Sequence, residues 1–289
     1  MKKKLTRIIA YAFLFSLSIL FIMPLLVTLT NSFMQEAEIS FSYTTKLSYF
    51  DLANGIKTNF LDISLIPRMV SFSQYKEVLV NQPSFLILLM NSVKITVPVV
   101  LGNVLISLLS AYGFTTWRWK YKEIIFYVYI IVMLMPLQAV LVPNYIIADK
   151  LHIKDSYLAI ILPGIFAPFG TFLLRQSMKA MPEEYFEAAT IDGAGKFITF
   201  TNIVIPQMKS GVAALSMLVF VEYWNLVEQA VIFIKDYFRE PLSVYLSRMS
   251  AGMIGIAFAA SCVYMFLPLW FLVLGQKDLE AGIELSGIK

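Results

Sequence analysis

The sequence predicts an all-α membrane protein with six transmembrane helices, and three observations lead to this fold class. Hydrophobic residues make up 58% of the 289 residues and charged residues 15%, against roughly 45–50% and 25% in soluble globular proteins. The chain contains six long apolar runs, and a helix needs about 20 such residues to cross a bilayer. A polar stretch, Met181 to Pro206, separates the fourth run from the fifth. We expect spans at 8–29, 86–114, 124–146, 158–174, 212–234 and 253–274.

Composition also limits the function. The net charge is only +4, so the charge balance gives no support for a nucleic-acid partner. The single cysteine, Cys262, rules out an intrachain disulfide, and the single histidine, His152, rules out a histidine cluster for catalysis or metal binding. Gly195-Lys196 lacks the earlier glycine and the following Ser or Thr of a phosphate-binding loop. We therefore predict no catalytic residues, no metal site and no cofactor bound by this chain.

The N-terminal part is expected to form one span and one long loop. The run 8–29 has no internal charge and follows four basic residues. It is too long for the apolar region of a signal peptide, so we interpret 1–29 as a retained N-terminal segment and transmembrane helix. Residues 30–83 form an extracytoplasmic loop whose aromatic-rich composition is not that of a flexible linker. An ordered cap and a docking surface for an extracytoplasmic partner are equally good interpretations of this loop.

The core domain, 84–289, holds the other five spans. In the second span, Ser92, Thr96 and Asn103 are four and seven residues apart, so they share one helix face. Polar groups inside a bilayer usually face the bundle interior or a water-filled path. Lys94, near one end of this span, is expected to extend its ammonium group to the outer interface.

The third and fourth spans are interrupted by proline. Pro136 and Pro143 are expected to break the third helix near its outer end, beside Gln138. Backbone groups freed at such breaks need partners in the protein or in a water-lined cavity. Pro163 and Pro168 lie in the fourth span.

The fifth span is the most polar. Glu222 and Asn225 are three residues apart and share a face. Carboxylates inside a span are costly, so these side chains are expected to meet water, a partner or a substrate. For Glu228, a structural salt bridge with Arg239 or Arg248 is an equally good interpretation.

The polar stretch 181–206 has clear helix signals. Pro182 suits the first turn of a helix, and the following Glu183 and Glu184 are favoured there by the helix dipole. Gly193 is expected to end the helix, because glycine readily adopts the left-handed conformation of a helix end. A second short helical run, Lys196 to Ile203, is expected to end at Pro206.

This stretch resembles the EAA loop, the cytoplasmic coupling loop of bacterial ABC importer permeases. Glu187-Ala188-Ala189, Gly193, Ile203 and Pro206 fall at the spacing of the family pattern, and Ile205 replaces the usual leucine. The resemblance implies that the loop helix sits in a cleft of an ATP-binding subunit and carries the motion of ATP-driven closure to the spans. It implies an ATPase-coupling role for Glu187, Ala188, Ala189, Asp192, Gly193 and Pro206.

Three other segments resemble carbohydrate-type permeases of this class. They are the third-span segment MPLQAVLVPNY, the pair Trp224-Asn225, and the glycine-containing tail 276–289, which is similar to that of maltose-type permeases. Sugars are bound by polar groups beside an aromatic face. We therefore predict a substrate pathway that includes Asn91, Gln138, Glu222, Trp224 and Asn225.

The resemblance implies a type I permease subunit of an ATP-driven ABC importer in the bacterial inner membrane, with an oligosaccharide as substrate. Its partners would be a second homologous permease, an extracytoplasmic solute-binding protein, and two ATP-binding subunits that hold ATP and Mg²⁺. The alternatives are a phosphorylated polyol or an acidic saccharide as substrate, which Lys94 favours, and a stand-alone secondary transporter using Glu222 and Glu228 for ions. Thirteen Lys and Arg residues fall on one side of the spans and nine on the other, so both termini are expected in the cytoplasm.

Overall fold

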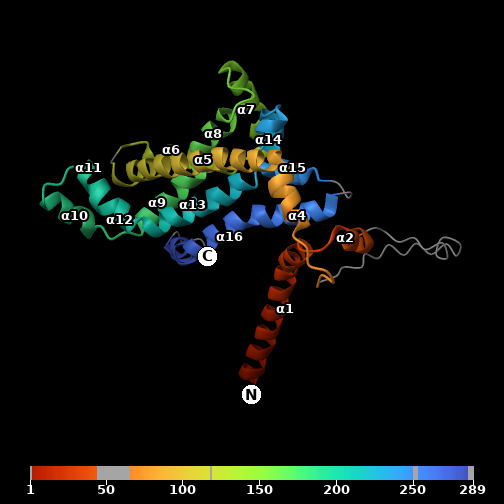
Figure 1. Ribbon diagram of the computed structural model, residues 1–289. Coiled ribbons are helices and arrows are strands. Elements are labelled where there is room, and N and C mark those ends of the chain that lie inside the picture. The colour runs from red at the N-terminus through yellow and green to blue at the C-terminus, as the bar shows by residue number, and fades with distance from the viewer. Residues whose placement is uncertain (1, 44–65, 118, 250–252, 286–289) are drawn as a thin grey trace. The chain divides into compact units, whose positions relative to one another are not determined.

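A computed structural model describes residues 2–43, 66–117, 119–249 and 253–285 (Figure 1). These described residues form helices and connections. The β-pairing among them is one isolated antiparallel bridge between Met34 and Val70. The chain divides into two compact units. Unit 1 contains residues 1–86 and 246–266, and unit 2 contains residues 87–245 and 267–289.

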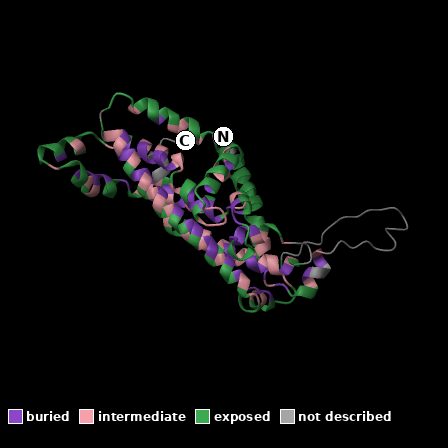
Figure 2. Cartoon of the chain, turned by 90° about the horizontal axis from the view of Figure 1, so that it is seen from above, coloured by how far each residue is buried: buried purple, intermediate pink, exposed green. Residues whose placement is uncertain are grey.

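Unit 1 contains the expected first span. Its helices are α1 (Lys2–Asn31), α2 (Glu36–Tyr43), α4 (Ser73–Lys76), the π-helical turn η1 (Glu77–Asn81) and the first part of α16 (Ile254–Leu285). Figure 2 shows exposed side chains over most of α1, as expected for a helix whose surroundings are lipid or other chains. Within the loop 30–83, residues 44–65 lie outside the described residues, so the choice between a cap and a docking surface stays open.

Unit 2 is built along α5 (Pro83–Thr116), and its other elements follow in chain order: α6 (Lys122–Met133), α7 (Leu137–Lys150), α8 (Leu158–Ile165), α9 (Pro168–Lys179), α10 (Glu184–Ile191), α11 (Lys196–Thr199), η2 (Phe200–Val204), α12 (Ile205–Gln207), α13 (Lys209–Trp224), α14 (Glu228–Phe233), η3 (Tyr237–Arg239) and α15 (Leu242–Ser247). Its core is a cluster of buried apolar side chains from α5, α7, α8, α9 and α13. In Figure 1, α10 and α11 lie at one end of α5, and α14 and α15 lie at the other.

The described helices agree with an all-α membrane fold. Four are long and apolar enough to span: Thr6–Asn31, Pro83–Thr116, Leu158–Lys179 and Ile254–Ala281. Two further pairs pass the same test but are bent, α6 with α7 by 102° and the α11–α12 segment with α13 by 72°. The expected six spans are obtained when each bent pair is one span. The first bend falls where the sequence predicted it, since Pro136 is the residue that precedes α7, but the break predicted at Pro143 is wrong, because Pro143 lies inside α7.

The predicted fifth span, 212–234, is not one continuous helix. Helix α13 begins at Lys209 and ends at Trp224, and α14 starts only at Glu228. The side-chain amide of Asn225 donates to the carbonyl of Val221 (2.9 Å), which also accepts the backbone N–H of Asn225 (3.2 Å). The Ser243 hydroxyl donates to the carbonyl of Leu226 in the break that follows. The Ser243 hydroxyl thus supplies a donor to a carbonyl in the break, where the helix stops inside an apolar run.

The second helical run ends one residue beyond the predicted Pro206. Helical turns continue through η2 and α12 to Gln207, and the bend comes at Met208. Pro206 occupies the first turn of α12, where a missing N–H leaves no bond unmade.

The break between α8 and α9 is held by Asn103 of α5. Its side-chain amide donates to the carbonyls of Gly164 (2.9 Å), Ile165 (3.3 Å) and Ala167 (3.4 Å). These carbonyls lie where the helical hydrogen bonds are interrupted, because α8 ends at Ile165 and α9 begins at Pro168, which has no N–H to donate. Asn103, Thr96 and Ser92 are all buried, which confirms the predicted polar face of this helix.

Replacing Asn103 with leucine should destabilise the protein by about 1–3 kcal/mol, because buried carbonyls would lose their donor. Thr96→Val is the matched control on the same helix face. The Thr96 hydroxyl is buried and has no hydrogen-bond partner among the described residues, so its loss should be neutral or slightly stabilising. Thermal unfolding of the detergent-solubilised protein measures both, and equal effects of the two substitutions would contradict the assigned role of Asn103.

Candidate functional site

The predicted coupling helix exists as α10. It ends where the sequence predicted: Asp192 is the C-terminal cap, and Gly193 has a φ of +71°. The Gly193 N–H donates to the carbonyl of Thr190 (3.1 Å), and the Ala194 N–H donates to that of Ala189 (2.9 Å). This pair of bonds closes the helix end. The left-handed backbone at Gly193 explains why a glycine suits this position.

The motif residues divide between two faces of α10. Glu184, Glu187, Ala188 and Ile191 are exposed, and their spacing of three, four and seven residues puts them on one face. Ile191 is 86% exposed, whereas Ala189 on the opposite face is 3% exposed. One alanine of the motif therefore packs inward, and the other lies beside Glu187 on an outer face where a small side chain allows close approach.

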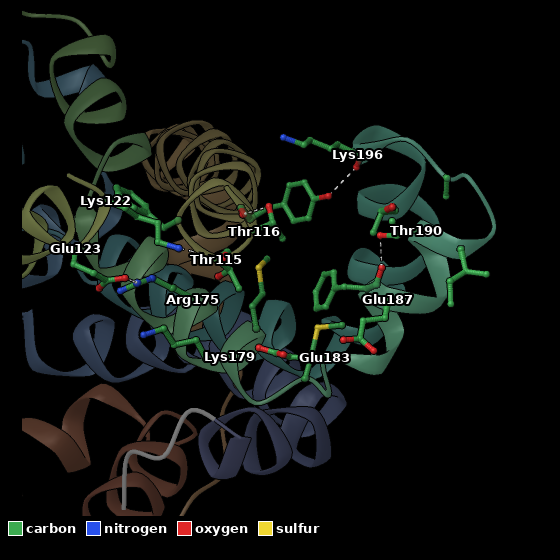
Figure 3. A pocket seen from close by; sticks show the side chains of 18 residues that line it. Thr115, Thr116, Lys122, Glu123, Arg175, Lys179, Glu183, Glu187, Thr190 and Lys196 are labelled. Carbon is green, nitrogen blue, oxygen red and sulfur yellow. Dashed lines mark hydrogen bonds and ion pairs between the residues drawn. The ribbon is translucent and has the colours of Figure 1, made fainter. Parts of the chain in front are cut away.

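Helix α10 borders a cavity of about 840 Å³ between α5, α6, α9 and α11, and Glu187 and Ile191 of its exposed face are among the residues that line it. In Figure 3, Lys122, Glu123 and Arg175 lie on one side of this cavity, and Glu183 and Glu187 lie on the other. Charged side chains of both signs therefore line this space.

The C-terminal side of the coupling loop is tied to the end of α5. The Tyr112 hydroxyl donates to the carbonyl of Lys196 (2.9 Å), and the Tyr112 ring packs on Phe200, with centroids 5.0 Å apart. The Lys196 ammonium lies 5.1 Å from the centroid of the Trp117 ring. The start of α11 is therefore linked to the end of α5 by a hydrogen bond and by ring contacts.

The N-terminal side of the loop is tied to α6 through Arg175 of α9. The guanidinium contacts the carboxylate of Glu123 at 2.6 Å and lies 3.7 Å from the centroid of the Phe126 ring. The Arg175 side chain is only 1% exposed, although that of Glu123 is 54% exposed. Charge pairing and stacking on an aromatic face are how a buried guanidinium is stabilised.

Sequence reasoning missed this pair, since it ended the fourth span at Leu174 and counted Arg175 as a loop residue. The structure continues α9 to Lys179 and buries Arg175. An available signal was the opposite charge of Glu123 and Arg175 at the ends of two spans expected on the same side.

The predicted substrate-pathway residues do not lie in equivalent environments. Asn91 is buried, and its amide donates to the carbonyls of Phe238 (2.7 Å) and Glu240 (3.1 Å). Trp224 is 1% exposed and stacks on Phe220, with ring centroids 5.3 Å apart. Both side chains are engaged within the chain, so the structure adds no support for direct substrate contact by either.

The other three pathway candidates, Gln138, Glu222 and Asn225, are exposed. Gln138 lies in the first turn of α7, and its amide donates to the carboxylate of Glu228 (3.1 Å). Arg239, one of the two cations considered for Glu228, instead pairs with Asp236 (3.6 Å). This side-chain hydrogen bond links the break before α7 to the break before α14.

Asp155, between α7 and α8, forms hydrogen bonds with the segment that follows α14. Its carboxylate accepts from the backbone N–H groups of Lys235 (2.9 Å) and Asp236 (3.4 Å). These bonds lower the pKa of the Asp155 carboxyl below its ordinary value. The Arg239 guanidinium donates to the Asp155 carbonyl (3.0 Å). The segment after α14 is therefore anchored, and it carries the carbonyls that bind Asn91.

A protein-family model matches residues 103–277, more than half of the chain. The matching family is described as the binding-protein-dependent transport system inner membrane component. The chain belongs to this family. This inner membrane component has, among its described residues, no group of three or more His, Cys, Asp or Glu side chains placed to hold a metal ion.

Several proteins are similar to this inner membrane component. The sn-glycerol-3-phosphate transport system permease protein UgpE of Yersinia pestis is 32% identical over 145 residues, 50% of this chain and 52% of that protein. The chain thus matches about half the length of these relatives. The arabinooligosaccharides transport system permease protein AraQ of Bacillus subtilis (strain 168) is 26% identical over 286 residues, 98% of this chain and 96% of that protein.

Solved structures support the fold. The crystal structure of a bacterial ABC transporter involved in the import of the acidic polysaccharide alginate matches with a TM-score of 0.75 at 18% identity, and covers 96% of this chain and 97% of that one. A second structure, of the alginate transporter in complex with an alginate pentasaccharide-bound periplasmic protein, matches with a TM-score of 0.58 at 14% identity. It covers 71% of this chain and 81% of that one.

Proposed function

We propose that this chain is a permease subunit of an ATP-driven, binding-protein-dependent importer, with an oligosaccharide as its substrate. The observation that carries the proposal is the outer face of α10. Glu184, Glu187, Ala188 and Ile191 form an exposed, partly apolar surface on a short helix. Exposed apolar surface rimmed by charge is typical of a protein interaction site. An ATP-binding subunit is the partner that fits, since the chain has no phosphate-binding loop of its own.

In this proposal, closure of two ATP-binding subunits around ATP and Mg²⁺ moves α10. The loop has two firm connections to the rest of unit 2, Arg175 with Glu123 on one side and Tyr112 with Lys196 on the other. Both are short-range contacts between helices that flank the coupling loop, so a shift of α10 would move α6, α9 and α5. Gly193 and Asp192 form the turn between the two connections, and Pro206 lies on the path to α13.

A second permease, an extracytoplasmic solute-binding protein and an inner-membrane location with both termini in the cytoplasm belong to the same proposal. The family description names binding-protein dependence and the inner membrane. The name of AraQ favours an oligosaccharide, whereas the name of UgpE favours a phosphorylated polyol as the second candidate.

Co-purification tests the assembly. A tagged chain extracted in detergent should bring with it ATP-binding subunits and a second permease in stable proportion. Recovery of the tagged chain alone, still folded and active in ion-driven transport, would instead support a stand-alone secondary transporter and contradict the proposal.

A further inference from the structure

An apolar groove lies beside the charged cavity that α10 borders. The groove has a volume of about 550 Å³ and is lined by Ser110, Gly113, Phe114, Trp117, Trp119 and Lys196. Both spaces lie within unit 2, and Phe114 and Lys196 line both of them. A charged cavity and an apolar groove therefore adjoin at the end of α5.

This end of α5 has the side chains that are typical of a membrane surface. The span Pro83–Thr116 ends here, and Trp117, Trp119 and Tyr121 follow it with exposed rings. Tryptophan and tyrosine are enriched where a membrane meets water, because their apolar rings carry one polar group. The apolar groove therefore lies at the depth where lipid headgroups join their acyl chains.

Two lysines bring positive charge to the place where the cavity and the groove adjoin. The Lys122 ammonium donates to the carbonyl of Thr115 (3.4 Å), and the Lys196 ammonium lies 5.1 Å from the centroid of the Trp117 ring. Figure 3 shows these lysines on either side of Thr115 and Thr116. Neither lysine forms an ion pair among the described residues. Both ammonium groups are therefore able to bind an anion at the end of α5.

The charges around the cavity are segregated. Four cations and three carboxylates line it: Lys122, Arg175, Lys179, Lys196, Glu123, Glu183 and Glu187. Glu123 contacts Arg175 at 2.6 Å, and Glu183 and Glu187 lie across the cavity from Lys122 (Figure 3). The separation of these charges, and not their sum, makes the α5 side of the cavity suited to an anion.

Two buried donors in the cavity wall have no acceptor among the described residues. They are the Thr115 hydroxyl and the Nε–H group of Arg175, and both residues line the cavity. Arg175 is 1% exposed. Buried donors are nearly always satisfied in folded proteins, so a ligand rich in acceptor oxygens suits this wall. A phosphate group supplies such oxygens together with the negative charge that the lysines favour.

We propose that the charged cavity and the apolar groove together bind one anionic phospholipid. Lys122, Lys196 and the Thr115 hydroxyl bind its phosphate, and an acyl chain lies in the groove against Phe114 and Trp117. Basic pockets between membrane helices bind anionic headgroups in this way. A free phosphate would use the same cations but would leave the groove empty, so the groove favours a lipid.

The inference goes beyond the proposed function, because it does not depend on the transported solute. Lys196 is the first residue of α11, and Thr115 lies in the last turn of α5. A lipid bound to both would bridge the coupling loop and the end of a membrane span. Its acyl chain would also cover the exposed rings of Trp117 and Trp119.

Photo-cross-linking in vesicles tests the inference. The complete transporter is reconstituted in phosphatidylcholine with a trace of phosphatidylglycerol that carries a diazirine on one acyl chain, and mass spectrometry locates the label. Residues that line the groove should be labelled at least about tenfold more than by a phosphatidylcholine probe with the same diazirine chain. In the variant Lys122→Gln/Lys196→Gln this labelling should fall about tenfold, because each basic residue near an anionic headgroup strengthens binding.

Lys120→Gln/Lys209→Gln is the matched control for charge. Lys120 lies two residues before Lys122, and Lys209 is the first residue of α13. Both are exposed, and neither lines the cavity or the groove. This control removes the same charge as the test variant and should leave the labelling unchanged.

Gly113→Leu tests the groove separately from the cations. An added Cβ atom at Gly113 meets nothing within 4 Å, and leucine favours a helix more than glycine does. The leucine side chain should fill part of the groove without a clash. Labelling should then fall by roughly fivefold or more, because less apolar surface is left for the acyl chain. Gel filtration of each complex checks that the variants assemble.

Three outcomes would overturn the inference. The first is equal labelling of the groove by the two lipid probes, and the second is an equal loss in the two lysine pairs. The third is displacement of the phosphatidylglycerol probe by glycerophosphoglycerol, its headgroup without acyl chains, as effectively as by unlabelled phosphatidylglycerol, since that would assign the site to a free phosphodiester. Each of these results would leave the proposed importer function standing, because co-purification tests that function independently.

Discussion

Replacing Glu123 with alanine is expected to destabilise the protein by about 3 kcal/mol, although the Glu123 side chain is 54% exposed. The reason lies in its partner. The Arg175 guanidinium is 1% exposed, so removal of the carboxylate leaves a buried cation without a counter-ion. The Nε atom of Arg175 is already buried without a hydrogen-bond partner, and no other carboxylate pairs with this guanidinium among the described residues.

Arg175→Met is the informative comparison. It removes the buried charge, keeps an unbranched side chain against Phe126 and Phe114, and leaves Glu123 free to be hydrated. Replacing a buried cation by an apolar side chain of similar length is often neutral or stabilising. The double variant Glu123→Ala/Arg175→Met should therefore be more stable than Glu123→Ala alone. Thermal unfolding followed by tryptophan fluorescence measures the series, and a larger loss in Arg175→Met than in Glu123→Ala would refute this explanation.

Gly193→Val is expected to reduce transport at least about tenfold and to weaken attachment of the ATP-binding subunit. The backbone of Gly193 has a φ of +71°, a conformation that costs roughly 1–2 kcal/mol for residues with a Cβ atom and more for β-branched ones. Nothing lies within 4 Å of an added Cβ atom. The expected defect therefore comes from backbone strain that changes the end of α10, and not from a steric clash.

Gly195 provides a matched control two residues away. An added Cβ atom at Gly195 also meets nothing within 4 Å, but its φ is −67° and its ψ is 160°, which valine adopts readily. Gly195→Val should keep near wild-type transport and ATPase recovery. Equal defects in the two variants would show that the left-handed turn at Gly193 has no special role.

Local signals explain which elements could be predicted from the sequence. Helix α10 was predicted well because its signals are local: Pro182 lies just before its N-cap Glu183, and Gly193 follows its C-cap Asp192. The bend at Pro136 was also predicted, since proline acts on its own helix. The polar face of α5 followed from the spacing of Ser92, Thr96 and Asn103, a property of one helix.

Long-range contacts explain what could not be predicted. Helix α13 stops at Trp224 inside an apolar run, and the donor for the carbonyl of Leu226 is Ser243, distant in sequence. Glu123 and Arg175 are 52 residues apart, and their pairing depends on how α6 packs on α9. Similarly, the side-chain amide of Asn91 donates to two carbonyls that are 147 and 149 residues away. A polar residue that suggested a substrate contact therefore forms hydrogen bonds within the fold.

Chemical cross-linking from the outer face of α10 tests the central proposal most directly. A single cysteine is placed at Ala188 in a Cys262→Ser background, and a thiol-to-amine cross-linker is applied to the assembled complex in membranes. We predict a covalent adduct with an ATP-binding subunit from Ala188→Cys, and none from Leu151→Cys, an exposed site between α7 and α8. An adduct from Leu151→Cys but not from Ala188→Cys would contradict both the coupling role of α10 and the proposed orientation of the chain.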